Sequence, residues 1–246
     1  MVLTLSNVYK SFNNGSSPFV LNIPSISLES GKLTFVMGHN GSEKSVFCKI
    51  ISGYIDNDRD LGISMDRREI PLSGFFSRVK MIHQKISDNL ALDLTVKENL
   101  IINSCPQRFI DKLLPFLSLN ETILQYCKTI PFLHEKANQP VKELSGGQQQ
   151  TLAFYTLLFT EPSLLLLDEF LSATDYSITS KLLVQAQKIA HKAHTIVLII
   201  SHDVDTALQY GDEIMIFRDG KIEQIISKDG SNWNADYIKA QINKSY

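Results

Sequence analysis

Short apolar runs, separated by glycines and polar segments, divide the chain into predicted strands. Residues 2–12 and 19–30 alternate apolar and polar positions, which is typical of antiparallel strands with one solvated face. Other runs are short and continuously apolar, as buried parallel strands are. These runs span 33–38, 163–170 and 195–203. Because helical patterns follow them, we expect an α/β fold with an antiparallel sheet at its start.

Helical patterns and a few further elements fill the remaining segments. Helices are predicted over 45–54, 95–104, 108–117, 144–160, 177–193 and 204–211, a strand over 79–84, a turn over 13–15, and a hairpin over 214–226. Thr95 and Glu98 have the spacing of a capping box at one helix start. Prolines interrupt the helical stretch between about 95 and 140, which indicates a small helical subdomain.

Composition narrows the class of protein. The 246 residues are 43% hydrophobic, which fits one globular domain with a sizeable core, and the net charge of −2 does not suggest nucleic acid or an anionic membrane. Cys48, Cys105 and Cys127 are too far apart for a metal motif or a secreted disulfide framework. The N-terminus lacks a signal-peptide pattern and no apolar run is long enough to span a bilayer, so we expect a cytoplasmic protein.

The segment 38–45, GHNGSEKS, resembles a phosphate-binding loop between a buried strand and a helix. In such loops the backbone N–H groups and the helix N-terminus bind phosphate, a lysine reaches the β and γ phosphates, and a hydroxyl ligates Mg²⁺. Lys44 and Ser45 have those positions, but Glu43 replaces the second glycine of the motif. Taken alone, the segment fits an ordinary glycine turn equally well.

Two further motifs support nucleotide chemistry. Asp168 and Glu169 end a buried strand, where ligands bind in open α/β sheets; Asp168 is suited to hold Mg²⁺, and Glu169 to act as a general base on water. On their own they also fit a solvated strand end. LSGGQ begins at Leu144 and lies 24 residues before Asp168. With these three motifs in order, the chain resembles the nucleotide-binding subunit of an ABC transporter, of which LSGGQ is the signature.

The resemblance runs from about residue 2 to 225 and implies a role for individual residues. It implies ATP and Mg²⁺ as cofactors, and catalysis by Glu169, His202 and Gln84. The ATP-binding residues implied are Phe12, Gly38, His39, Asn40, Gly41, Ser42, Glu43, Lys44 and Ser45, with Ser145, Gly146, Gly147 and Gln148 of the signature; the metal-binding residues implied are Ser45, Gln84 and Asp168. Tyr9 remains an alternative to Phe12 for stacking on adenine, and either ring also fits a core position. Residues 172–175 resemble the D-loop.

The resemblance also implies an architecture and partners. It implies one nucleotide-binding domain over 1–246, with a P-loop NTPase (RecA-like) core, an N-terminal antiparallel β subdomain, and a helical signature subdomain inserted at about 88–160. Two such subunits, identical or different, would sandwich two ATP molecules head to tail. Integral membrane permease subunits would hold the dimer at the inner face of the cell membrane, and no nucleic acid is expected.

Three positions depart from the family pattern. Phe170 replaces a proline, which we expect to be mild, and Thr151 replaces a common arginine, which removes a charge from the signature helix. Glu43 matters most. A side chain costs on the order of 1 kcal/mol if the backbone there needs φ > 0. A carboxylate about 5 Å from a phosphate charge is repelled by roughly 3 kcal/mol unless solvent screens it. The carboxylate would also favour the empty helix N-terminus, so we predict weak ATP binding and slow turnover.

Three functions compete at this point. The first is an ATPase subunit that energises transport. The second is a nucleotide-sensing module that dimerises without hydrolysis, which Glu43 favours and Glu169 and His202 oppose. The third is an ABC ATPase acting on DNA or ribosomes, which the absence of a long insert or tandem cassette and the acidic balance disfavour. Phosphate release with partner subunits present distinguishes the first two.

Overall fold

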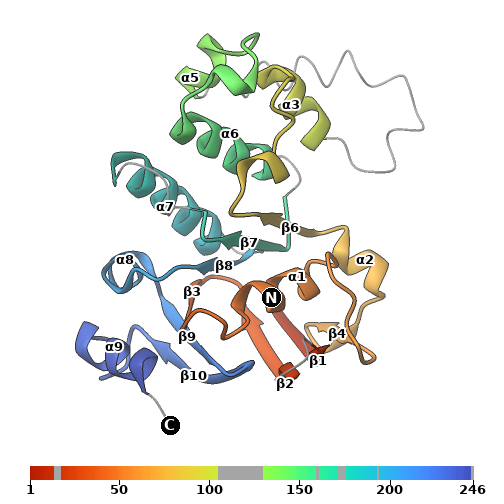
Figure 1. The fold of residues 1–246 in the computed structure, drawn as a ribbon, viewed down its shortest axis with the longest axis vertical. Coiled ribbons are helices and arrows are strands. Elements are labelled where there is room, and N and C mark those ends of the chain that lie inside the picture. The colour runs from red at the N-terminus through yellow and green to blue at the C-terminus, as the bar shows by residue number, and fades with distance from the viewer. Residues whose placement is uncertain (14–17, 105–129, 159–160, 171–175, 193, 245–246) are drawn as a thin grey trace. The chain divides into compact units, whose positions relative to one another are not determined.

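The chain folds into two compact units that are discontinuous in sequence. The computed structural model describes residues 1–13, 18–104, 130–158, 161–170, 176–192 and 194–244 (Figure 1). The first unit contains Met1–Met81, Ser163–Ser172 and Leu183–Tyr246, and the second contains Ile82–Pro162 and Ala173–Leu182. The predicted phosphate-binding loop lies in the first unit and the signature segment in the second.

A six-stranded sheet forms the framework of the first unit (Figure 1). Its order is β10 (Lys221–Ser227), β9 (Glu213–Arg218), β3 (Leu33–Met37), β8 (Ile196–Ile200), β7 (Leu164–Asp168) and β6 (Val79–Ile82). The continuously apolar runs form its centre, where every residue of β3, β7 and β8 is buried. β3 runs parallel to β8 and β9, and β7 parallel to β8, so their carboxyl ends share one edge. That edge is where open α/β sheets bind ligands.

Helices and a second sheet complete the first unit. The helices described within it are α1 (Lys44–Ile51), α2 (Leu72–Phe76), α8 (Val204–Tyr210) and α9 (Ala235–Asn243); α7 (Tyr176–His191) begins in the second unit and ends in the first. The rings of Phe47 on α1 and Phe217 on β9 have centroids 5.3 Å apart in the core. The antiparallel sheet has the order β2 (Pro18–Glu29), β1 (Val2–Asn13), β4 (Gly62–Met65) and β5 (Arg68–Glu69).

The second unit is helical where the structure describes it. It contains α3 (Val96–Ser104), α5 (Pro131–Glu135) and α6 (Gly146–Leu158), with 3-10 turns η1 (Ile86–Asp88) and η3 (Val141–Glu143). Leu100, Leu133 and Leu152 are fully buried in its core. The predicted capping box is confirmed: the Thr95 N–H donates to the Glu98 carboxylate at 2.8 Å, and the Glu98 N–H donates to Thr95 Oγ1 at 3.2 Å. The helix predicted over 108–117 lies outside the described residues.

The mixed α/β class and the antiparallel sheet at the start are confirmed, but four predicted strands were too long. The strands predicted over 163–170 and 195–203 are the shorter β7 and β8. β3 ends at Met37, because Gly38 turns the chain with φ 150°. β6 ends at Ile82 rather than at residue 84, and just beyond its end the backbone of His83 bonds to the side chain of Asn89. β4, β5, α2 and α9 were not predicted. Part of the turn predicted over 13–15 lies outside the described residues.

Candidate active site

The loop between β3 and α1 is closed around the Lys44 ammonium. Lys44 Nζ donates to the carbonyls of Gly38 at 2.9 Å and His39 at 2.8 Å, and to Ser42 Oγ at 3.3 Å. Lys44 is only 5% exposed, and burial lowers its pKa, against the opposing charges of nearby carboxylates. An ammonium held among backbone carbonyls at a helix start lies where a phosphate anion would be bound.

Gly38 and Gly41 have different reasons to lack a side chain. A Cβ on Gly38 would lie 2.3 Å from the Phe217 carbonyl oxygen, so the close approach of β9 requires glycine there. Gly41 has φ 79°, a left-handed conformation that L-residues with side chains disfavour, and open space around it. His39, Asn40 and Gly41 are exposed, as residues that surround a ligand from solvent need to be.

Glu43 adopts the backbone conformation that makes its side chain costly. Its φ is 71° and its ψ 27°, in the left-handed region, where a non-glycine residue costs about 1–2 kcal/mol. The cost that the sequence predicted for a side chain at φ > 0 therefore applies to Glu43. The carboxylate forms no hydrogen bond that caps α1. That its charge favours the empty helix N-terminus through the helix dipole stays a prediction. It is partly buried, and that desolvation raises its pKa against the opposing effect of Lys44.

Ser45 and Asp168 come together from opposite parts of the sequence. Ser45 Oγ donates to Asp168 Oδ1 at 2.9 Å, across 123 residues. Asp168 is 6% exposed at the end of β7. A hydroxyl and a carboxylate are hard oxygen ligands of the kind that Mg²⁺ prefers, so this pair fits that ion. Within the described residues, no cluster of three or more His, Cys, Asp or Glu side chains could hold a metal by itself.

Glu169 and His202 form a second contact at the same edge of the sheet. His202 Nε2 lies 2.8 Å from Glu169 Oε1, which joins the ends of β7 and β8. Glu169 has φ 45°, a conformation that is strained for a non-glycine residue and is often found at functional sites. Both side chains are partly open to solvent, so a water molecule has access to the carboxylate.

The signature segment begins α6 with a reciprocal cap that the sequence analysis missed. The Gln148 N–H donates to Ser145 Oγ at 3.4 Å, and the Ser145 N–H donates to Gln148 Oε1 at 3.1 Å. The S-x-x-Q spacing could have revealed this capping box. A Cβ on Gly147 would lie 2.3 Å from Ile178 Cδ1, whereas one on Gly146 would meet nothing within 4 Å. Gly147 therefore serves packing, and Gly146 leaves an open approach to the helix start.

The remaining predicted site residues are placed as follows. Gln84 is exposed in the loop between β6 and η1, within the second unit. Phe12 is partly exposed near the end of β1, with Lys10 Nζ 5.9 Å from its ring centroid. The Arg59 guanidinium lies 3.7 Å from the ring centroid of Tyr9, so one face of that ring is covered. Thr151 donates to the Gly147 carbonyl and Phe170 is buried, whereas residues 172–175 lie outside the described part of the chain.

A parallel sheet whose central strand leads through a lysine-centred loop into a helix defines a P-loop nucleotide-binding fold. The family model described as ABC transporter matches residues 21–172, more than half of the chain. The protein belongs to the ABC transporter family, as a nucleotide-binding domain.

Curated relatives support this assignment. The chain is 30% identical over 223 residues to the spermidine/putrescine import ATP-binding protein PotA of Fusobacterium nucleatum, covering 91% of this chain and 56% of that protein. It is 28% identical over 234 residues to the sulfate/thiosulfate import ATP-binding protein CysA of Mesostigma viride, covering 92% of this chain and 62% of the relative. The chain thus spans little more than half the length of these relatives.

Solved structures share the fold. The dimeric structure of MJ0796, a bacterial ABC transporter cassette, superposes with a TM-score of 0.76 at 24% identity, covering 93% of this chain and 99% of that chain. The ADP conformation of MJ1267, another ATP-binding cassette, has a TM-score of 0.76 at 24% identity, covering 98% and 94%. The predicted P-loop NTPase fold is confirmed. No helix among the described residues is long and apolar enough to cross a membrane.

Proposed function

We propose that this chain is the ATP-binding and ATP-hydrolysing subunit of an ABC transporter, whose turnover drives transport through separate membrane subunits. The observation that carries the proposal is the set of contacts at one edge of the central sheet. There the loop is closed on Lys44, Ser45 meets Asp168, and Glu169 meets His202. The relatives are named as ATP-binding proteins of import systems, which supports the same class of function.

In the proposed mechanism, phosphate replaces the internal partners of Lys44. The β and γ phosphates take hydrogen bonds from the Lys44 ammonium and from backbone N–H groups of the loop. Ser45 and Asp168 would hold Mg²⁺, which when bound would offset charge on the phosphates. The 2.9 Å contact between Ser45 Oγ and Asp168 Oδ1 supports this role, because it brings the two oxygens together.

Glu169 would act on the attacking water. A carboxylate at this position accepts a proton as water attacks the γ-phosphate. His202 holds the Glu169 carboxylate at 2.8 Å and would turn toward the γ-phosphate when ATP is bound. Gln84 would contribute a contact to Mg²⁺ and water. Phe12 would stack on adenine, since Arg59 covers one face of the alternative ring, Tyr9.

The proposed assembly is a head-to-tail dimer, of two identical or two different subunits. The start of α6 would receive the γ-phosphate held by the loop of the other subunit. There Ser145 Oγ accepts from the Gln148 N–H, and a Cβ on Gly146 would meet nothing within 4 Å. The second unit would be the inserted helical subdomain and would contact the permease. The protein would then be cytoplasmic and peripheral at the inner face of the membrane.

Glu43 makes this an attenuated ATPase in our proposal. Its left-handed backbone and partly buried carboxylate both act against a phosphate in the loop. A repulsion of roughly 3 kcal/mol at about 5 Å corresponds to about a hundredfold loss of affinity. The same residue supports the second candidate function, a nucleotide-sensing module that does not hydrolyse ATP.

Phosphate release from Mg²⁺–ATP tests the proposal. The chain is assayed alone and with membranes carrying its permease, beside Lys44→Ala as the control for contaminating ATPases. We expect release that depends on Mg²⁺ and is absent from the Lys44→Ala variant. ATP binding without release, in both preparations, would instead identify the sensing module; neither binding nor release would overturn both.

A further inference from the structure

Asn89 fixes the backbone on both sides of Gln84. Asn89 Oδ1 accepts from the His83 N–H at 2.8 Å, and Asn89 Nδ2 donates to the His83 carbonyl at 2.7 Å. The same Nδ2 donates to the Lys85 carbonyl at 3.1 Å. One side-chain amide thus bonds to the residues immediately before and after Gln84, whose own side chain is exposed.

The Asn89 side-chain amide supplies hydrogen-bond partners to the backbone just beyond the end of β6. β6 ends at Ile82, and beyond it the N–H and C=O of His83 need partners in a half-buried position. A carboxamide supplies the two bonds because it has an acceptor and a donor on one short side chain. An aspartate would keep only the acceptor, and an alanine would keep neither.

Asn99 holds the following part of the same segment in the same way. Its Oδ1 accepts from the Ala91 N–H at 2.8 Å, and its Nδ2 donates to the carbonyls of Ala91 at 2.9 Å and Thr95 at 3.0 Å. Asn99 lies on α3 and is 1% exposed, so its bonds are shielded from water. Two asparagines therefore fix the segment between β6 and α3, and the clamp formed by Asn89 is the one that surrounds Gln84.

We propose that Asn89 is a positioning residue that fixes the backbone on both sides of Gln84 and so limits the positions of the Gln84 side chain. This inference rests on the proposed function, in which Gln84 meets Mg²⁺ and the attacking water. A glutamine on an unrestrained loop would occupy many positions, and ordering its backbone would cost conformational entropy. Because the clamp already fixes this backbone in the folded chain, little further ordering is needed when ATP binds. Such ordering affects the rate, since small misplacements of catalytic groups lower rates steeply.

A double-mutant cycle on the full chain tests the link between Asn89 and Gln84. Phosphate release is measured for the native chain, Asn89→Ala, Asn89→Asp, Gln84→Ala and the double variant Gln84→Ala/Asn89→Ala. We expect Asn89→Ala to lower kcat roughly ten- to hundredfold with KM for ATP nearly unchanged. Asn89→Asp should lower kcat less, because the hydrogen-bond acceptor remains. The double variant should have a kcat no lower than that of Gln84→Ala alone.

Ser87→Ala is the matched control, since Ser87 is an exposed residue of the same loop that bonds only weakly, at 3.3 Å, to Asp88. It should leave kcat unchanged. Losses from Gln84→Ala and Asn89→Ala that add in the double variant, or an Asn89→Ala variant with native kcat, would overturn the proposal. If turnover of the native chain is too slow to measure, the same set is compared in a Glu43→Gly chain.

Backbone dynamics of the nucleotide-free chain separate failure of the clamp from failure of the proposed function. We expect ¹⁵N relaxation to show an ordered Gln84 amide in the native chain and increased motion in Asn89→Ala. If the Gln84 amide is as ordered in Asn89→Ala as in the native chain, the positioning role is overturned, whether or not the chain hydrolyses ATP. A different outcome is that the Gln84 amide is ordered in the native chain and more mobile in Asn89→Ala, while the chain binds ATP without hydrolysing it. That result would contradict the proposed ATPase function and would support the clamp formed by Asn89.

Discussion

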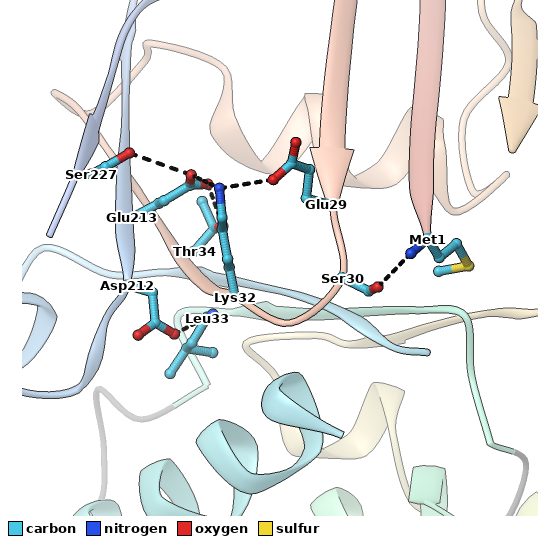
Figure 2. A network of polar contacts seen from close by, with 9 residues as sticks. All are labelled: Met1, Glu29, Ser30, Lys32, Leu33, Thr34, Asp212, Glu213 and Ser227. Carbon is cyan, nitrogen blue, oxygen red and sulfur yellow. Dashed lines mark hydrogen bonds and ion pairs between the residues drawn. The ribbon is translucent and has the colours of Figure 1, made fainter. Parts of the chain in front are cut away.

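The two ends of strand β3 differ in the partners of their charged side chains. At its start, Lys32 Nζ lies 2.6 Å from Glu213 Oε1 and 2.9 Å from Glu29 Oε2 (Figure 2). At the same end the Leu33 N–H donates to Asp212 at 2.8 Å, and the amino group of Met1 donates to Ser30 Oγ at 3.0 Å (Figure 2). Opposite charges meet directly there, and the residues join three strands of the first unit.

At the other end of β3 the arrangement is strained and less completely paired. Lys44 donates to carbonyl oxygens and a hydroxyl instead of a carboxylate, and Glu43 and Glu169 adopt left-handed φ values. A protein keeps such costs where a ligand is expected to relieve them. The comparison teaches that ion pairs stabilise the fold at one end of the strand, whereas the other end carries backbone strain; under the proposed function that strained end binds an anion and a metal ion.

The largest expected effect comes from Glu169→Gln at the strained end. Turnover should fall by about 10²- to 10⁴-fold, because the amide cannot accept a proton from water. ATP binding should persist. Glu161→Gln is a matched control, since Glu161 is also a glutamate with positive φ, at 43°, but lies in the second unit. Phosphate release and equilibrium ATP binding are measured for both; a Glu169→Gln chain with native turnover would remove Glu169 from the mechanism.

Glu43→Gly should raise ATP affinity by about a hundredfold, as removal of roughly 3 kcal/mol of repulsion predicts. It should also raise the unfolding free energy by about 1 kcal/mol, because glycine adopts φ 71° without strain. Glu43→Gln separates the two causes: it removes the charge and keeps the strained side chain. Titration calorimetry and thermal unfolding measure both quantities. Equal ATP affinity in all three chains would show that the carboxylate is screened by solvent.

The affinity difference between the native chain and Glu43→Gln should narrow as pH falls. Burial raises the pKa of Glu43 above its ordinary 4.5, so protonation neutralises the carboxylate at a less acidic pH than for a free glutamate. The contribution of this group to the stability of the folded chain is therefore complete below its ordinary pKa of 4.5 and is lost as pH rises through the raised pKa. Because ATP titrates in both chains, the ratio of their dissociation constants at pH 8 and pH 5 is the measurement. A ratio that stays constant would contradict the electrostatic explanation.

The smallest effect is expected at the paired end of β3. Lys32→Met should lower the unfolding free energy by about 1 kcal/mol, as loss of a partly exposed ion pair does, and should leave ATP binding unchanged. Hydrogen bonds to Glu213 and Glu29 raise the pKa of Lys32 to about 12. Its stabilising contribution is thus complete below its ordinary pKa of 10.5 and lost as pH rises through about 12. Denaturant unfolding at neutral pH checks the first value; a weakened ATP affinity would contradict the separation of the two ends.

The sequence by itself determined the elements whose signal is local. The apolar runs that became β3, β7 and β8 were identified because complete burial leaves a continuous hydrophobic pattern. The capping box of Thr95 and Glu98 follows from a fixed spacing on one helix. The sequence also predicted backbone strain at Glu43, on the condition that this position has φ > 0, because the motif usually has a glycine there.

Only the tertiary structure decided which distant groups meet. Ser45 and Asp168 are 123 residues apart, and Glu169 and His202 are 33 apart; only the parallel order of the strands brings them to one edge. Likewise, β4 was missed because its pairing to β1 is a long-range contact with a weak local pattern. The clamp of Asn89 was missed because one asparagine in a polar loop carries no signal of its own. Hydrogen-bond partners depend on the folded path of the chain, which local residue patterns do not encode.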